Sequence, residues 1–189
     1  MGRKNFTHLS DYRLDSIKEN KIIFDTNILV NLYYPELNNK SNVNTDIIKK
    51  IEDILEDCKI KDVKIKIIVP VISEFYNLAL NVAFNNYVES NKITDRKFNK
   101  KKYRSTDDFK VANSNILKII DTFCEEFEIE HFDFEYTSTE NKEDKLSSLD
   151  FTDLIISSYC EKGDICLLTL DMDFRRTFRR DLKFSIISS

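Results

Sequence analysis

The chain has 189 residues, of which 41% are hydrophobic and 33% charged, and its formal net charge is −4. This composition is typical of a globular domain and excludes a disordered chain; no apolar run approaches the roughly 20 residues that span a membrane. The first residues are polar, so we expect no secretory signal, no membrane association and a cytoplasmic location.

Glycine, histidine and cysteine are too few or too scattered for several common sites. With only two glycines, the chain cannot contain a glycine-rich phosphate-binding loop. Two histidines argue against a Ser-His-Asp or Cys-His hydrolase. The four cysteines form no close pair, so we expect reduced, mostly buried thiols rather than a zinc site.

Apolar runs alternate with amphipathic segments along the chain. Strands are predicted at residues 22–25, 63–69, 128–134, 165–169 and 184–187. Helices or helical turns are predicted at residues 27–34, 46–58, 73–88, 109–127, 148–160 and 172–181, with polar loops at 35–44 and 137–145. The alternation predicts an α/β fold: a mainly parallel five-stranded sheet flanked by helices, in a single domain covering residues 1–189.

Acidic residues follow these apolar segments at comparable places. Asp25 ends the first strand, Glu74 follows the second, Asp153 precedes an apolar helical stretch, and Asp171 and Asp173 follow the fourth strand. Taken singly, Asp25 could be a helix N-cap and Glu74 a solvated surface residue. We interpret Asp150 as a helix N-cap. In a parallel sheet, however, the carboxyl ends of the strands meet, and converging carboxylates cannot all stay ionised without a cation.

The ligand types indicate which cation such a site would hold. Carboxylate oxygens without histidine or cysteine favour hard ions, so Mg²⁺ or Mn²⁺ is expected. Such ions can activate water and stabilise the leaving oxygen of a phosphodiester.

Basic residues are concentrated in two segments although the chain is acidic overall. Residues 92–104 contain seven basic residues and one acid, within an insert at about residues 87–105, and residues 98–105 look too basic to be core. The second segment, near the C-terminal end of the sequence, contains Arg175, Arg176, Arg179, Arg180 and Lys183. Either segment could simply be solvated surface. As nucleic-acid contacts close to the acidic site we select Lys100, Lys101, Lys102 and Arg104 in the insert, and Arg175 and Arg176 near the C-terminus.

The order of the acidic motifs and the residues around each acid resemble those of the PIN-domain nucleases. The stretch Ile22-Ile23-Phe24-Asp25-Thr26-Asn27 resembles the first motif of that family, and Ser73-Glu74 the second. Asp153 before Leu-Ile-Ile resembles the third, and Leu167-Leu168-Thr169-Leu170-Asp171 the fourth. The resemblance covers most of the chain outside the basic insert and the first twenty residues.

The resemblance implies a Mg²⁺- or Mn²⁺-dependent endoribonuclease that cleaves RNA phosphodiester bonds. Its catalytic acids would be Asp25, Glu74, Asp153 and Asp171, with Asp173 as a further metal ligand or as the alternative to Asp171; Thr26, Asn27 and Thr169 could orient water or phosphate. A toxin of the VapC type is one such protein, with an antitoxin or a second copy of the chain as candidate partners, and the basic insert could then dock the antitoxin. The alternatives are a non-catalytic PIN-like RNA-binding or scaffold module and a receiver-like phosphoacceptor domain. The sequence does not identify the RNA, or exclude DNA.

Overall fold

The structure is built on a sheet whose neighbouring strands all run parallel. The computed structural model describes residues 6–34, 45–131, 149–163, 165–177 and 184–188. Within them the strands are β1 (Phe6–His8), β2 (Lys21–Phe24), β3 (Lys64–Ile68), β4 (Glu128–Glu130), β5 (Cys166–Thr169) and β6 (Ser185–Ser188). They lie in the order β1-β6-β5-β2-β3-β4, with every pair parallel. The predicted α/β fold is confirmed, but the sheet has six strands among the described residues, not five.

The additional strand is β1, which lies at one edge of the sheet. Phe6 pairs with Ile186 and His8 with Ser188 of the last strand, β6. Its three residues are half-buried and carry no apolar run, so the sequence offers no strand pattern there. Pairing with a strand about 180 residues away, rather than local propensity, gives this segment its conformation.

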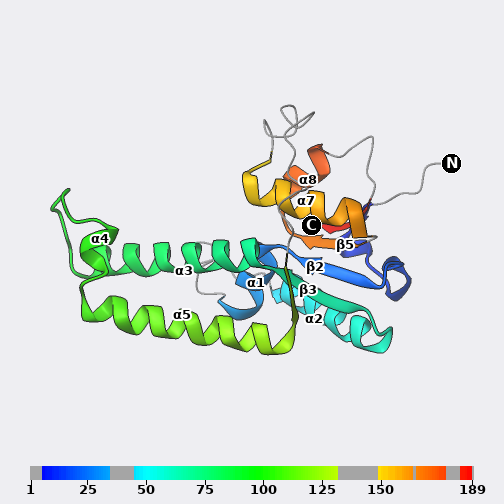
Figure 1. The fold of residues 1–189 in the computed structure, drawn as a ribbon, viewed down its shortest axis with the longest axis horizontal. Coiled ribbons are helices and arrows are strands. Elements are labelled where there is room, and N and C mark those ends of the chain that lie inside the picture. The colour runs from blue at the N-terminus through cyan, green and yellow to red at the C-terminus, as the bar shows by residue number, and fades with distance from the viewer. Residues whose placement is uncertain (1–5, 35–44, 132–148, 164, 178–183, 189) are drawn as a thin grey trace.

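Helices cover both faces of the sheet. They are α1 (Thr26–Tyr33), α2 (Thr45–Ile60), α3 (Val69–Ser90), α4 (Lys100–Tyr103), α5 (Asp107–Glu126), α7 (Phe151–Gly163) and α8 (Met172–Thr177), with short 3-10 turns at Leu9–Asp11 and Leu14–Ser16. In Figure 1, α7 and α8 lie on one side of the sheet and α1 and α2 on the other. The central strands are therefore buried on both faces, which explains why β2 and β5 read as continuous apolar runs. Among the described helices, none combines the length and apolarity needed to cross a membrane.

Several predicted boundaries shift once the fold is seen. The helix predicted from residue 73 begins at Val69, because Pro70 fits the first turn and the preceding strand ends at Ile68. Beyond the described residues lie the predicted loops 35–44 and 137–145, the end of the predicted strand 128–134, and the end of the predicted helix 172–181.

Helices α3 and α5 run side by side away from the sheet, with α4 at their far end (Figure 1). We call these three helices the helical arm. The rings of Phe75 and Phe123 lie 5.2 Å apart between the two long helices. The Tyr76 hydroxyl donates to Asn113 Oδ1 at 2.7 Å, which adds a polar contact between the two helices. The arm is therefore a packed helix pair and not an extended loop.

The distal end of the arm has an aromatic cluster of its own. Helix α3 ends where Lys92 adopts a left-handed conformation (φ 49°) and the Ile93 N–H donates to the Val88 carbonyl at 3.0 Å. The chain then folds back so that five rings contact one another: Phe84, Tyr87, Phe98, Tyr103 and Phe109. Tyr103 is buried, so the expectation that residues 98–105 contain no core residue is wrong. The aromatic side chains Phe98 and Tyr103 face the cluster, while the lysines between them stay exposed.

The strand order places a crevice at the carboxyl ends of β2 and β5. After β2 the chain adds β3 and β4 on one side of it, then crosses to β5 and β6 on the other. Loops leaving two adjacent parallel strands in opposite directions leave an opening between them, which is where α/β folds bind ligands.

Candidate active site

The register between β2 and β5 brings Asp25 beside Thr169. Phe24 pairs with Leu168, and the Asp25 N–H donates to the Leu168 carbonyl at 3.0 Å, so the next residue on each strand lies at the same level. The Thr169 hydroxyl donates to Asp25 Oδ2 at 2.5 Å. Asp25 is also the N-cap of α1, and its Oδ1 accepts from the Thr26 N–H at 2.6 Å. The N-cap role and a functional role thus fall on the same buried carboxylate.

Asn27 connects the ends of the two strands. Its Nδ2 donates to Asp25 Oδ2 at 2.6 Å and to Thr169 Oγ1 at 3.2 Å. Its Oδ1 accepts from the Leu170 N–H at 2.9 Å. Both polar atoms of this amide are occupied by protein, so Asn27 fixes the carboxylate of Asp25 and does not itself offer a free group to a ligand.

Glu74 and Asp153 come from two helices that meet near Asp25. Glu74 lies in the second turn of α3, and its Oε2 accepts from the Thr26 hydroxyl at 2.9 Å. Asp153 lies in the first turn of α7. Its N–H donates to Asp150 Oδ1 at 2.9 Å, and the Asp150 N–H lies 3.4 Å from Asp153 Oδ2, so the two residues cap the helix reciprocally. The N-cap role read from the sequence for Asp150 is confirmed.

Asp171 follows β5 and borders the same crevice. Its N–H donates to Thr169 Oγ1 at 2.9 Å, which makes Thr169 a partner of both Asp25 and Asp171. Asp171 Oδ1 accepts from the Asp173 N–H at 2.7 Å at the start of α8. Of the two aspartates that the sequence left as alternatives, Asp171 lines the pocket, and Asp173 is not among its lining residues.

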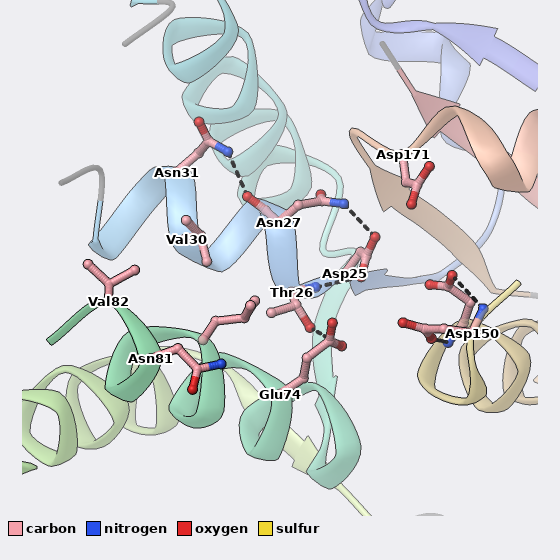
Figure 2. A pocket seen from close by; sticks show the side chains of 12 residues that line it. Asp25, Thr26, Asn27, Val30, Asn31, Glu74, Asn81, Val82, Asp150 and Asp171 are labelled. Carbon is pink, nitrogen blue, oxygen red and sulfur yellow. Dashed lines mark hydrogen bonds between the residues drawn. The ribbon is translucent and has the colours of Figure 1, made fainter. Parts of the chain in front are cut away.

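Together these elements enclose a pocket of about 410 Å³ (Figure 2). Five acids line it: Asp25, Glu74, Asp150, Asp153 and Asp171. The other lining residues are Thr26, Asn27, Val30, Asn31, Leu78, Asn81 and Val82. Within the described part of the chain, no lysine or arginine lines the pocket. The structure thus brings together the four acids selected from the sequence and adds the capping residue Asp150.

Burial and mutual repulsion make ionisation of these acids unfavourable. Burial raises the pKa of Asp25 to about 6; hydrogen bonds from Thr169 and Thr26 oppose the shift, and the charges of Glu74 and Asp171 add to it. Burial, followed by the charge of Asp25, raises the pKa of Asp153 to about 8. The pKa of Glu74 is also raised, mainly by burial. Acids in this state stay charged together at neutral pH only when a cation compensates them.

The side chains share a pocket without forming a ready-made coordination sphere. In the described part of the chain, no group of three or more His, Cys, Asp or Glu side chains is arranged to hold a metal ion as it stands. The carboxylates instead accept hydrogen bonds from neighbouring protein groups, as those of Asp25 and Glu74 do. The donor set still fits a hard cation in its chemistry, because it offers oxygen ligands with unfavourable charge and no competing base. Holding one ion with several of these acids requires side-chain rotation.

The predicted nucleic-acid contacts lie in two different places. Helix α8 begins directly after Asp171, so Arg175 and Arg176 lie on a helix that starts at the rim of the pocket. Lys100, Lys101, Lys102 and Arg104 lie at the distal end of the arm, all exposed. From Glu74 to the end of α3 at Ser90 the helix rises about 24 Å. The expectation that the insert lies close to the acidic site is therefore wrong.

Sequence reasoning missed the part of the pocket that α1 and α3 supply beyond the acids. Asn31, Leu78, Asn81 and Val82 line it, together with Val30. The available signal was helical spacing: residues 78, 81 and 82 lie four, seven and eight positions after Glu74 and so share its face of α3.

Comparison with known proteins gives a match in structure and none in sequence. No protein family and no curated protein matches the sequence significantly. The fold is similar to that of a chain in the crystal structure of VapBC2 from Rickettsia felis bound to a DNA fragment from their promoter, with a TM-score of 0.52 and 17% identity. The match covers 89% of this chain and 98% of that chain. At this identity the likeness concerns the fold alone, and it supports a PIN-like fold for the protein.

Proposed function

We propose that the protein is a Mg²⁺- or Mn²⁺-dependent endoribonuclease of the PIN type, with the acidic pocket as its active site. One observation carries the proposal. Acids that stand far apart in the sequence line a single pocket at the carboxyl ends of β2 and β5, and no basic residue is among the lining residues that the structure describes. Carboxylates in that arrangement favour a divalent cation over a bound anion.

The residues of the pocket have two roles: some would bind the cation, and others orient the residues that bind it. Asp25, Glu74, Asp153 and Asp171 would bind the metal, which supplies an activated water and stabilises the leaving oxygen when bound. Thr169 and Asn27 keep the Asp25 carboxylate in one orientation through the hydrogen bonds described above. Asp150 positions Asp153 by capping α7.

The basic residues outside the pocket would contact the phosphate backbone of the RNA. Arg175 and Arg176 lie on the helix next to the pocket, whereas the lysines of α4 would contact a more distant part of the same molecule. Such contacts position the substrate without reading its sequence. A toxin role, with an antitoxin as partner, is the biological setting we favour, because the fold is shared with a chain of the VapBC2 structure.

The alternative is a non-catalytic module of the same fold that binds RNA. Such a module has no use for several buried or half-buried acids whose pKa values are raised, because these acids reduce stability at neutral pH. Calorimetric titration with Mn²⁺ separates the two. A nuclease should bind the ion with an affinity that depends on the acidic residues of the pocket, and an RNA-binding module should not bind it.

The decisive experiment compares Asp25→Asn with Asp150→Asn in an RNA cleavage assay with magnesium. Asp25→Asn removes a ligand charge at nearly constant volume and should abolish cleavage. Asp150→Asn should reduce cleavage much less, because an asparagine also caps a helix. Unfolding curves of both variants control for loss of the fold. Full cleavage by purified Asp25→Asn, with contaminating nucleases excluded, would disprove the assignment.

A further inference from the structure

The pocket has two chemically different ends. The carboxylates lie at the end formed by β2, β5 and α7. At the other end α1 and α3 supply aliphatic and amide side chains. Figure 2 shows Val30, Asn31, Asn81 and Val82 on the side away from Asp150 and Asp171. The metal-binding proposal gives the first end a role and leaves the second without one.

The second end lies at a suitable distance for the base of a nucleotide whose phosphate is at the acids. Asn81 is seven residues after Glu74 on the same face of α3, a rise of about 10.5 Å. The sugar separates the phosphate of a nucleotide from its base, so an unpaired base whose phosphate is at the acids can reach toward this end of the pocket.

Asn81 is half-buried and keeps its hydrogen-bonding capacity for a ligand. Its side-chain amide forms no hydrogen bond with any other residue in the described ranges, unlike Asn27, whose two polar atoms are occupied. Leu78, one turn before Asn81, is 41% exposed although it lines the pocket. An open aliphatic surface next to an uncommitted amide suits a ligand with an apolar face and a polar edge.

We propose that the end of the pocket formed by Val30, Leu78, Asn81 and Val82 is a subsite for an unpaired nucleobase next to the cleaved phosphodiester, and that Asn81 reads its edge. The proposal rests on the nuclease function proposed above. The aliphatic side chains contact the faces of the base, as they do in enzymes that extrude a base. The Asn81 amide offers one donor and one acceptor side by side, which matches N6 and N7 of adenine. We take adenine as the preferred base, in a single-stranded region where its edge is accessible.

Cleavage of a randomised single-stranded RNA pool tests this specificity. Sequencing of the fragments cut by the wild type should show adenine enriched about tenfold at one position beside the cut. Asn81→Ala should remove the enrichment and change total cleavage far less. Asn85→Ala is the matched control, because Asn85 lies one turn further along α3, is exposed and does not line the pocket; it should keep the enrichment. A pool cut without base preference, or the same preference in Asn81→Ala, would overturn the proposal.

A binding measurement separates failure of the subsite from failure of the nuclease. In a ¹⁵N-labelled protein with magnesium, adenosine 5′-monophosphate should shift the side-chain amide signals of Asn81, which are assigned by their absence in Asn81→Ala. Ribose 5-phosphate, which lacks the base, should shift them much less. If the nucleotide shifts these signals but no RNA is cleaved, the nuclease fails and the subsite stands. If RNA is cleaved while Asn81 neither responds to the nucleotide nor affects base preference, the subsite alone is wrong.

Discussion

Replacing Asp153 by asparagine should stabilise the metal-free protein and at the same time abolish cleavage. The pKa of this carboxyl is raised from 3.8 to about 8, mainly by burial and next by the charge of Asp25. In the unfolded chain it ionises near pH 4, so between pH 4 and 8 the unfolded state releases a proton that the folded state retains. Stability therefore falls as pH rises through this window, and asparagine, which does not titrate, removes that contribution.

The size of the effect follows from the width of the window. From pH 3.8 to pH 7 is about three units, each worth about 1.4 kcal/mol, which gives a ceiling of about 4 kcal/mol at pH 7. Asp153 is only partly buried, and solvent screens part of the interaction, so we expect a gain of about 2 kcal/mol. Among the described residues, its carboxylate accepts one hydrogen bond, a long one from the Asp150 N–H at 3.4 Å, so the substitution loses little hydrogen bonding.

Urea unfolding in excess chelator, followed by circular dichroism at pH 4.5 and pH 8, measures this gain. The curves of the wild type and Asp153→Asn should nearly coincide at the lower pH and separate at the higher one. Asp53→Asn on α2, where the aspartate is exposed, controls for the loss of a charge anywhere on the surface. A variant that is less stable than the wild type at pH 8, or a gain of equal size at both pH values, would refute the reasoning.

Three further predictions concern the metal, the support of Asp25 and the arm. Manganese should raise the midpoint of thermal unfolding more at pH 8 than at pH 5.5, because Asp25 and Asp153 hold protons at the lower pH; an equal rise at both would place the ion elsewhere. Thr169→Val removes a buried hydroxyl with three hydrogen-bond partners, so it should lower the free energy of unfolding in urea by about 1–3 kcal/mol and slow cleavage strongly. Thr169→Ser keeps the hydroxyl and should retain most of the stability and most of the cleavage rate. Replacing the three lysines of α4 by alanine should weaken binding of long RNA and flatten its salt dependence, with little effect on binding of a short oligonucleotide. The same change at the exposed Lys18, Lys49 and Lys59 should leave binding of long RNA unchanged. Equal behaviour of the two triple variants would exclude the arm as an RNA contact.

The charge distribution explains why the arm is worth testing despite its distance from the pocket. Residues 91–106 contain seven basic residues and one acid, a net charge of +6. Because the whole chain carries −4, the remaining residues sum to −10. An RNA approaching the acidic pocket is repelled by most of the surface and attracted by the end of the arm.

The position of the site could be predicted because it depends on features that the sequence carries locally. Buried parallel strands are apolar on both faces, and the residue that ends such a strand is at the ligand-binding edge whatever the details of packing. Asp25 after Phe24 and Asp171 after Leu170 are of this kind. Helical spacing also places Asp153 on the same face as its cap, Asp150.

What could not be predicted depends on contacts between distant segments. The strand β1 has no apolar pattern and is defined only by its pairing with β6. The basic insert looked like an accessory to the site, but its direction is set by the packing of α3 on α5, which carries it away from the sheet. The base-contacting end of the pocket depends on how α1 and α3 lie together, so the role of Asn81 is not visible in the sequence around it.

The hydrogen bond between Thr169 and Asp25 joins residues 144 positions apart, and this has a consequence for synthesis of the protein. While the chain emerges from the ribosome, β2 and β3 can pair early, but β5, which carries Thr169 to the side of Asp25, is made much later. A nascent chain that stops before β5 already contains the acids of β2, α3 and α7, but it lacks Asp171 and the Thr169 hydroxyl that donates to the Asp25 carboxylate. The complete pocket can therefore assemble only after β5 has been translated, and an activity that depends on Thr169 and Asp171 is withheld until then.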